Sequence, residues 1–129
     1  MQDISFKLDT WTPEMTRLRA GPLLKTLWQR MDSIAKQVRH KGSFEGEQKV
    51  VMYSAHDTTV AYFLNSIGAF DPPVAPAYAS CVIIELFQNS SGEFDIRLLF
   101  RNDTGITFGD KYLTKLSFSH YFLHFFQTK

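Results

Sequence analysis

A short apolar run followed at once by a helical pattern constrains the fold of this 129-residue chain more than any other feature. Residues 49–54 contain four consecutive apolar or aromatic side chains, which is typical of a strand buried on both faces. Residues 58–67 place their apolar side chains on one helical face, and Gly68 follows as a helix end. A strand, a short turn and a helix form the unit on which α/β proteins build sites, so we expect an α/β fold.

A long amphipathic helix is predicted before this unit. Thr12 as N-cap and Pro13 at the first helical position are typical of a helix start, and the pair Gly21-Pro22 then interrupts the pattern. The pattern resumes as an apolar stripe that lasts until Gly42, the expected C-cap. The stripe consists of Leu24, Leu27, Trp28, Met31, Ile34, Ala35 and Val38.

A β-hairpin is predicted in the second half of the chain. Asp71-Pro72-Pro73 and Pro76 favour a loop, because proline cannot continue a helix. Two β-prone segments, residues 80–88 and 93–101, then flank the turn sequence Asn-Ser-Ser-Gly at 89–92. The expected order of elements is therefore helix, strand, helix and hairpin.

Composition excludes some classes of protein. The net charge is +1 and the basic residues form no cluster, so nucleic acid is not an expected partner. The single cysteine, Cys81, precludes an internal disulfide and indicates a reducing compartment or a buried structural thiol. Residues 1–5 lack the pattern of a signal peptide, and the aromatic run 118–126 is too short to cross a bilayer.

His56 and Asp57 suggest chemistry, because they stand where the predicted strand leads into the helix. The first turn of a helix offers unpaired N–H groups and the positive end of the dipole, so an anion binds there readily. His56 can donate a hydrogen bond to a phosphoryl oxygen, and Asp57 can supply a proton to a leaving alcohol. The alternative is that Asp57 or Thr58 caps the helix and His56 is an ordinary loop histidine.

The segment Tyr53–Thr59 (Tyr-Ser-Ala-His-Asp-Thr-Thr) resembles one that ends a strand in the acid-phosphatase branch of the histidine acid phosphatases. Other parts of the sequence are similar to the same family. They are residues 17–24, Pro72-Pro73 with residues 77–86, and Phe100-Arg101-Asn102.

The resemblance implies a fold and a set of boundaries. It implies a partial mixed-sheet α/β domain of the phosphoglycerate mutase/histidine phosphatase type, ending in a β-hairpin. Residues 11–104 would be the C-terminal part of the catalytic domain of a histidine acid phosphatase. Residues 1–10 would be an irregular leader, and residues 105–129 would be a divergent tail.

The resemblance also implies roles for the matched residues. In the family a histidine within Arg-His-Gly-x-Arg-x-Pro attacks phosphorus and becomes a phosphohistidine. Asp57 looks like the proton donor to the leaving group, His56 like the residue that contacts the phosphate, and Thr58 like a second substrate-binding residue. The implied ligand is a phosphate monoester or inorganic phosphate, with no metal and no cofactor. The family further implies a homo-oligomer.

The nucleophile motif itself does not occur in the sequence. Arg39-His40-Lys41-Gly42 is the closest string, but it lacks a glycine directly after the histidine, and a charged helix end explains it. We therefore expect the isolated chain to be inactive, and the alternative function is that of a noncatalytic or interaction module. Residues 50–53 would lack neighbouring strands, which favours association. A phytase or inositol-phosphate phosphatase is disfavoured by the sequence Asp-Thr-Thr at 57–59.

Three residues outside the site carry further expectations from the resemblance. Cys81 looks like a family cysteine whose disulfide partner does not occur in this sequence, which would leave Cys81 as a free thiol. Asn89 and Asn102 begin glycosylation sequons, which would matter in a secretory parent. The family parent would be lysosomal or secreted.

Overall fold

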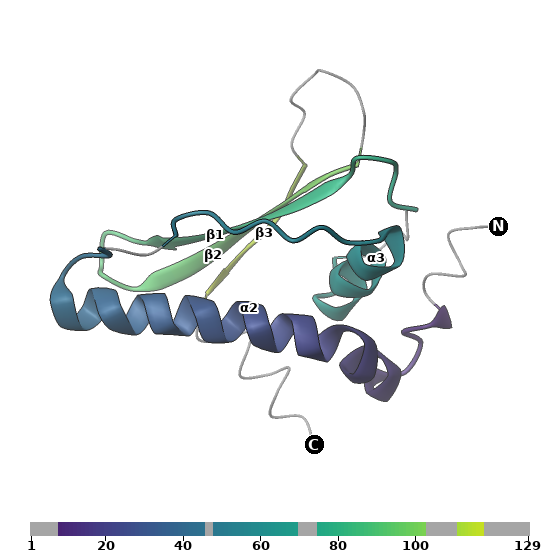
Figure 1. The fold of residues 1–129 in the computed structure, drawn as a ribbon, viewed down its shortest axis with the longest axis horizontal. Coiled ribbons are helices and arrows are strands. Elements are labelled where there is room, and N and C mark those ends of the chain that lie inside the picture. The colour runs from purple at the N-terminus through teal and green to yellow at the C-terminus, as the bar shows by residue number, and fades with distance from the viewer. Residues whose placement is uncertain (1–7, 46–47, 70–74, 103–110, 118–129) are drawn as a thin grey trace. The chain divides into compact units, whose positions relative to one another are not determined.

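The computed structural model describes residues 8–45, 48–69 and 75–102, and the backbone of residues 111–117 (Figure 1). The chain divides into two compact units, residues 1–75 and residues 76–129. The first unit contains helices α2 (Pro13–Lys41) and α3 (Asp57–Ser66). The second contains strands β1 (Cys81–Gln88), β2 (Phe94–Arg101) and β3 (Lys111–Ser117). Helices and an antiparallel hairpin are thus both present, as expected for part of an α/β domain.

The two ends of helix α2 confirm the predicted caps. The Thr12 side chain accepts a hydrogen bond from the backbone N–H of Met15 at 3.2 Å. At the other end Gly42 adopts a left-handed conformation with φ 75°, and its N–H donates to the carbonyl of Val38 at 2.8 Å. Glycine adopts this conformation without a Cβ clash, so it ends the helix at low cost.

The predicted interruption of α2 at Gly21-Pro22 is wrong, because the helix runs through both residues. Proline removes the hydrogen bond to the carbonyl four residues earlier, which belongs to Leu18. Leu18 is exposed, so water can solvate that carbonyl, while Ala20 and Leu24 on either side of the proline are buried. Burial on both sides holds the helix together where local propensity would end it.

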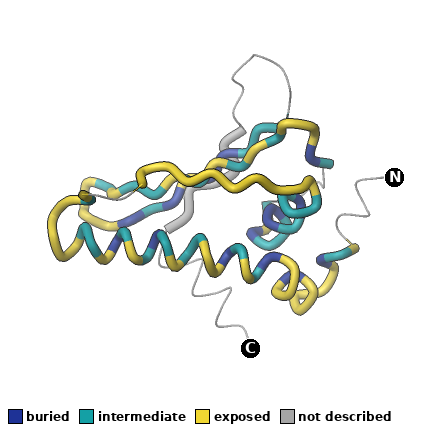
Figure 2. The backbone as a smooth tube through the Cα atoms, viewed as in Figure 1, coloured by how far each residue is buried: buried dark blue, intermediate teal, exposed yellow. Residues whose placement is uncertain are grey.

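Helix α3 packs against α2 and completes the core of the first unit (Figure 2). It was predicted over residues 58–67 and begins and ends one residue earlier. The buried residues of α2 recur mainly at intervals of four, so they share one face of the helix. The buried apolar side chains of this unit are Ala20, Leu24, Met31, Ala35, Ala61, Phe63, Leu64 and Ile67.

The strand predicted over residues 49–54 does not form. This segment has neither helix nor strand, and Val50, Val51, Met52 and Tyr53 are all exposed. A strand buried on both faces needs a hydrogen-bonded neighbour on each side. Among the described residues the only sheet is β1-β2-β3, so the segment has no strand to pair with.

The second unit is a three-stranded sheet in the order β1-β2-β3, with both pairs antiparallel. The predicted hairpin is confirmed: Asn89 and Glu93 close its turn with an N–H to carbonyl bond of 2.8 Å, and Gly92 has φ 84°. The described strands include no parallel pair, whereas a mixed sheet was expected. Strand β3 was not predicted, since residues 105–129 were expected to be a divergent tail.

The two faces of strand β1 differ in their exposure to solvent. Cys81, Ile83 and Glu85 of β1 are exposed, and the residues between them are half-buried. Arg97 of β2 lies opposite Glu85, bonds to its carboxylate at 3.2 Å, and places its guanidinium over the ring of Phe87. The expectation of a buried thiol at Cys81 is therefore wrong, because Cys81 shares the solvated face with this ion pair.

Candidate functional site

Helix α3 begins at the His56-Asp57 pair. His56 is the N-cap, with extended backbone angles (φ −82°, ψ 161°), and its side chain makes no capping hydrogen bond. Its carbonyl accepts from the N–H groups of Thr59 at 3.0 Å and Val60 at 3.2 Å. The imidazole is exposed, so it is available to a ligand at the positive end of the helix.

Asp57 is the first residue of α3, and its carboxylate turns back onto the helix. One carboxylate oxygen accepts from the N–H of Thr58 at 2.6 Å. This contact fits the capping alternative, because the acid satisfies an amide that has no partner within the helix. A phosphate at this helix start would compete with Asp57 for the Thr58 amide. Asp57 is exposed and can rotate away from that amide.

The arrangement has the components of an anion site with an acid beside it. The helix start provides amide donors, the exposed imidazole provides a further donor, and Thr58 is half-buried at the second helical position. The negative charge of Asp57 opposes an anion, whereas its protonated form does not and also carries a transferable proton. The geometry therefore favours anion binding in the acid form of Asp57.

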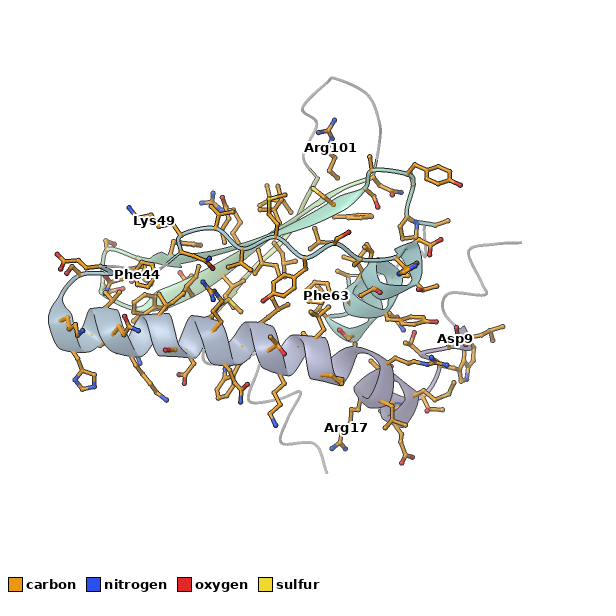
Figure 3. The ribbon with its side chains drawn as sticks, viewed as in Figure 1. Asp9, Arg17, Phe44, Lys49, Phe63 and Arg101 are labelled. Carbon is orange, nitrogen blue, oxygen red and sulfur yellow. The ribbon has the colours of Figure 1, made fainter. Side chains whose placement is uncertain are left out.

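Residues just before α2 hold α3 in place. The Tyr62 hydroxyl donates to the carboxylate of Asp9, which lies just before α2 (Figure 3). The Asn65 side-chain amide donates to the carbonyl of Thr10 at 3.2 Å and to its hydroxyl at 2.5 Å. The Arg19 guanidinium lies 5.7 Å from the centre of the Tyr62 ring. These contacts fix the helix whose first residues are His56 and Asp57.

Sequence reasoning missed this anchor. Residues 1–10 were predicted to be an irregular leader, yet Asp9 and Thr10 contact α3 across 53 and 55 positions of the chain. The hydrogen bond to Asp9 raises the pKa of the Tyr62 hydroxyl above its usual value of 10.0, and burial and the nearby carboxylates add to this effect. No local pattern signals such a pair, because neither residue repeats with a helical or strand period.

The other residues that the sequence analysis singled out do not belong to the start of α3. His40 is exposed in the last turn of α2, where it complements the negative end of the helix dipole. Asn89 and Asn102 belong to the second unit. The Asn89 side-chain oxygen accepts from Ser91 and Glu93 within the hairpin turn, and that of Asn102 accepts from the N–H of Ala77 at 2.8 Å. The loop prediction at residues 71–73 lies outside the described residues.

The described residues contain no group of three or more histidine, cysteine, aspartate or glutamate side chains that could hold a metal ion. Within the same residues, no helix combines the length and hydropathy needed to cross a membrane.

Comparison with known sequences identifies the class of protein. The Histidine phosphatase superfamily (branch 2) matches residues 3–101, which include both helices, the His56-Asp57 pair and the hairpin. The chain belongs to this family. The match also covers Asp9 and Thr10, which anchor α3.

The relatives are acid phosphatases. The chain is 35% identical over 91 residues to bovine lysosomal acid phosphatase (Bos taurus), covering 70% of this chain and 20% of that protein. It is also 35% identical over 91 residues to rat prostatic acid phosphatase (Rattus norvegicus), covering 70% of this chain and 22% of that protein. The chain thus spans about a fifth of the length of these relatives. No solved structure matches it.

Proposed function

We propose that this chain provides the acid/base part of an acid phosphatase site, which acts on phosphate monoesters through a phosphohistidine intermediate in the complete enzyme. Asp57 protonates the leaving alcohol, and His56 contacts the phosphate together with Thr58. The observation that carries the proposal is the exposed His56-Asp57 pair at the start of α3, within the range matched by the family.

The charges at this helix start support hydrolysis at acidic pH. A phosphate monoester is an anion, so the carboxylate of Asp57 repels it and holds the Thr58 amide at 2.6 Å. Protonation of Asp57 removes the repulsion and frees the amide, and it creates the acid that the leaving alkoxide needs. One protonation thus prepares both binding and catalysis.

The matching nucleophile is a histidine of an Arg-His-Gly-x-Arg-x-Pro motif, which does not occur in these 129 residues. His40 is a poor substitute, since it lies in the last turn of α2, where the dipole favours a cation rather than phosphate. We therefore assign phosphate binding and the acid to this chain, and the covalent step to a histidine that it does not contain.

Phosphate binding tests the assigned residues directly. Titration of the purified chain with inorganic phosphate at pH 5, followed by amide NMR shifts, should perturb residues 57–59 most. His56→Ala should weaken binding roughly fivefold to tenfold, since it removes one charge-assisted hydrogen bond that is open to solvent. His40→Ala is the matched control, an exposed histidine at the other helix end, and should bind as the wild type does. Shifts centred on residues 39–42 would overturn the assignment.

Turnover separates this function from the alternative of a noncatalytic interaction module. The isolated chain should not hydrolyse 4-nitrophenyl phosphate in steady state, and acid-quenched samples should contain no phosphohistidine. In a complex or longer chain that contains the nucleophile, Asp57→Ala should remove most turnover. Undiminished turnover in that variant would disprove the role of Asp57 as proton donor.

A further inference from the structure

One side of helix α3 carries polar side chains along its length. Thr58, Tyr62 and Asn65 are spaced by four and three residues, so they lie on the same side of the helix. All three are half-buried, whereas Ala61 and Leu64 are fully buried in the apolar core of the unit. Thr58 is a proposed phosphate contact, and Tyr62 follows it one turn later on the same side.

The segment before α2 holds this polar side at two points. The Tyr62 hydroxyl donates to the Asp9 carboxylate, and the Asn65 amide donates to the carbonyl of Thr10 at 3.2 Å. The Thr16 hydroxyl of α2 donates to the same carbonyl at 2.9 Å, so Thr10 joins both helices. Two contacts about one turn apart oppose a rotation of α3 about its axis.

Tyr62 is linked to the start of α3 by charge as well as by position. The hydrogen bond to Asp9 is the main cause of the raised pKa of the Tyr62 hydroxyl, and the carboxylate of Asp57 contributes to the same shift. The hydroxyl therefore lies within electrostatic range of the proposed proton donor. On α2, the Arg19 guanidinium lies 5.7 Å from the centre of the Tyr62 ring, which is within the range of a cation–π contact. The ring is thus held from α2, and its hydroxyl from residue 9.

We propose that Tyr62 is a positioning residue of the phosphate site, a role that rests on the proposed function of the start of α3. Its hydrogen bond to Asp9 fixes the rotation of α3, so that His56 and Thr58 keep the orientation in which they meet a single anion. Tyr62 does not touch the substrate and acts through the helix. Loss of the hydroxyl leaves the donors in place but lets the helix turn, so a smaller fraction of the molecules is ready to bind.

Phosphate titration of Tyr62→Phe tests this role against a purely structural one. The variant keeps the ring and loses the donor, so it should bind inorganic phosphate at pH 5 roughly threefold to fivefold more weakly than the wild type. Ile67→Val is the control, because it removes one buried methylene at the C-terminal end of α3 and should lower stability by a similar amount. It should bind phosphate as the wild type does. Equal weakening in both variants would make Tyr62 a stabilising residue only and would overturn the proposal.

Two substitutions of Asp9 separate the hydrogen bond from the charge. Asp9→Asn and Asp9→Ala both remove a negative charge that opposes an anion, but only asparagine keeps an oxygen that accepts from Tyr62. Asp9→Ala should therefore bind phosphate roughly threefold to fivefold more weakly than Asp9→Asn. Adding Tyr62→Phe to Asp9→Ala should cause no further loss, since the bond is already absent. The two Asp9 variants test the role even if Tyr62→Phe does not fold.

The possible outcomes separate this proposal from the proposed function. A wild-type chain that binds no phosphate would refute the proposed function, and the positioning role with it. Phosphate binding in the wild type, with the same affinity in Tyr62→Phe or in both Asp9 variants, would overturn the positioning role alone. Weakening confined to the variants that lose the bond between Tyr62 and Asp9 supports it.

Discussion

At the scale of single residues, the contact between Tyr62 and Asp9 shows how a site is held by groups outside it. Asp57 begins α3, and Tyr62 lies on the same helix a little more than one turn later. Its hydroxyl ties that helix to Asp9, which precedes the first residue of α2 by four positions. The same hydrogen bond raises the pKa of Tyr62, because ionisation would remove the donated proton beside a carboxylate.

Tyr62→Phe should therefore lower the free energy of unfolding by about 1 kcal/mol at neutral pH, the usual size of a partly exposed hydrogen bond. The pKa is higher in the folded chain than the ordinary value of 10.0, so the stabilisation is complete below pH 10 and is lost as the pH rises through the raised pKa. Urea unfolding between pH 7 and pH 11 measures this. Tyr78→Phe, at a fully exposed tyrosine, should show no difference from wild type, and a similar loss there would refute the assignment.

The sequence predicts which residues make up the candidate site, but it does not predict the contacts that hold them in place. His56, Asp57 and Thr58 form a contiguous motif, and the helix that they begin follows from local periodicity. The carboxylate turned onto the Thr58 amide depends on a rotamer that no pattern encodes. The contact from Asp9 depends on the fold of the first unit, so only the structure could reveal it.

At the scale of elements, sequence patterns correctly predict those features whose contacts join residues close together in the chain. Thr12 and Gly42 act within one turn of their helix, and the hairpin turn at residues 89–92 brings together strands that are adjacent in sequence. The same signals failed at Pro22, where burial of flanking residues decides, and at residues 49–54, where a strand requires distant neighbours. Strand β3 was missed because residues 105–129 were expected to be a divergent tail, so no element was predicted there.

Pro22 allows a test of how much helix stability the proline costs and the buried flanking residues offset. Pro22→Ala restores a backbone N–H that can donate to the exposed carbonyl of Leu18, and position 22 is exposed, so no cavity results. The helix should gain roughly 1–2 kcal/mol, since part of the proline penalty is offset by a more flexible unfolded chain. Thermal unfolding followed by circular dichroism measures the gain. Lys25→Ala, on the exposed surface of the same helix, should change stability by less than about 0.5 kcal/mol. A loss of stability in Pro22→Ala would show that the helix needs its proline.

At the scale of the whole molecule, the chain spans about a fifth of the length of the acid phosphatases that it resembles, and its described residues belong to two units. The first unit buries an apolar core between α2 and α3, while the segment that leads to His56 leaves Val50 and Met52 in solvent. Among the described residues, the start of α3 is therefore positioned by the packing of the two helices and by Asp9 and Thr10, not by a preceding strand.

Asp57 has two effects at the candidate site, and one variant separates them. Its carboxylate repels an anion and holds the Thr58 amide at 2.6 Å, whereas its acid form supplies a proton to the leaving alkoxide. Asp57→Asn keeps the shape of the side chain without the charge or the proton. Phosphate binding should therefore be retained in this variant, while turnover in a complex or longer chain that contains the nucleophile should be lost.

Phosphate titration and turnover of 4-nitrophenyl phosphate measure the two effects separately. Thr58 keeps its backbone amide in the variant, so a phosphate at the helix start still finds its donors. Loss of phosphate binding in Asp57→Asn would contradict the assignment of the anion site to the start of α3. Turnover that persists in Asp57→Asn would instead contradict the role of Asp57 as proton donor.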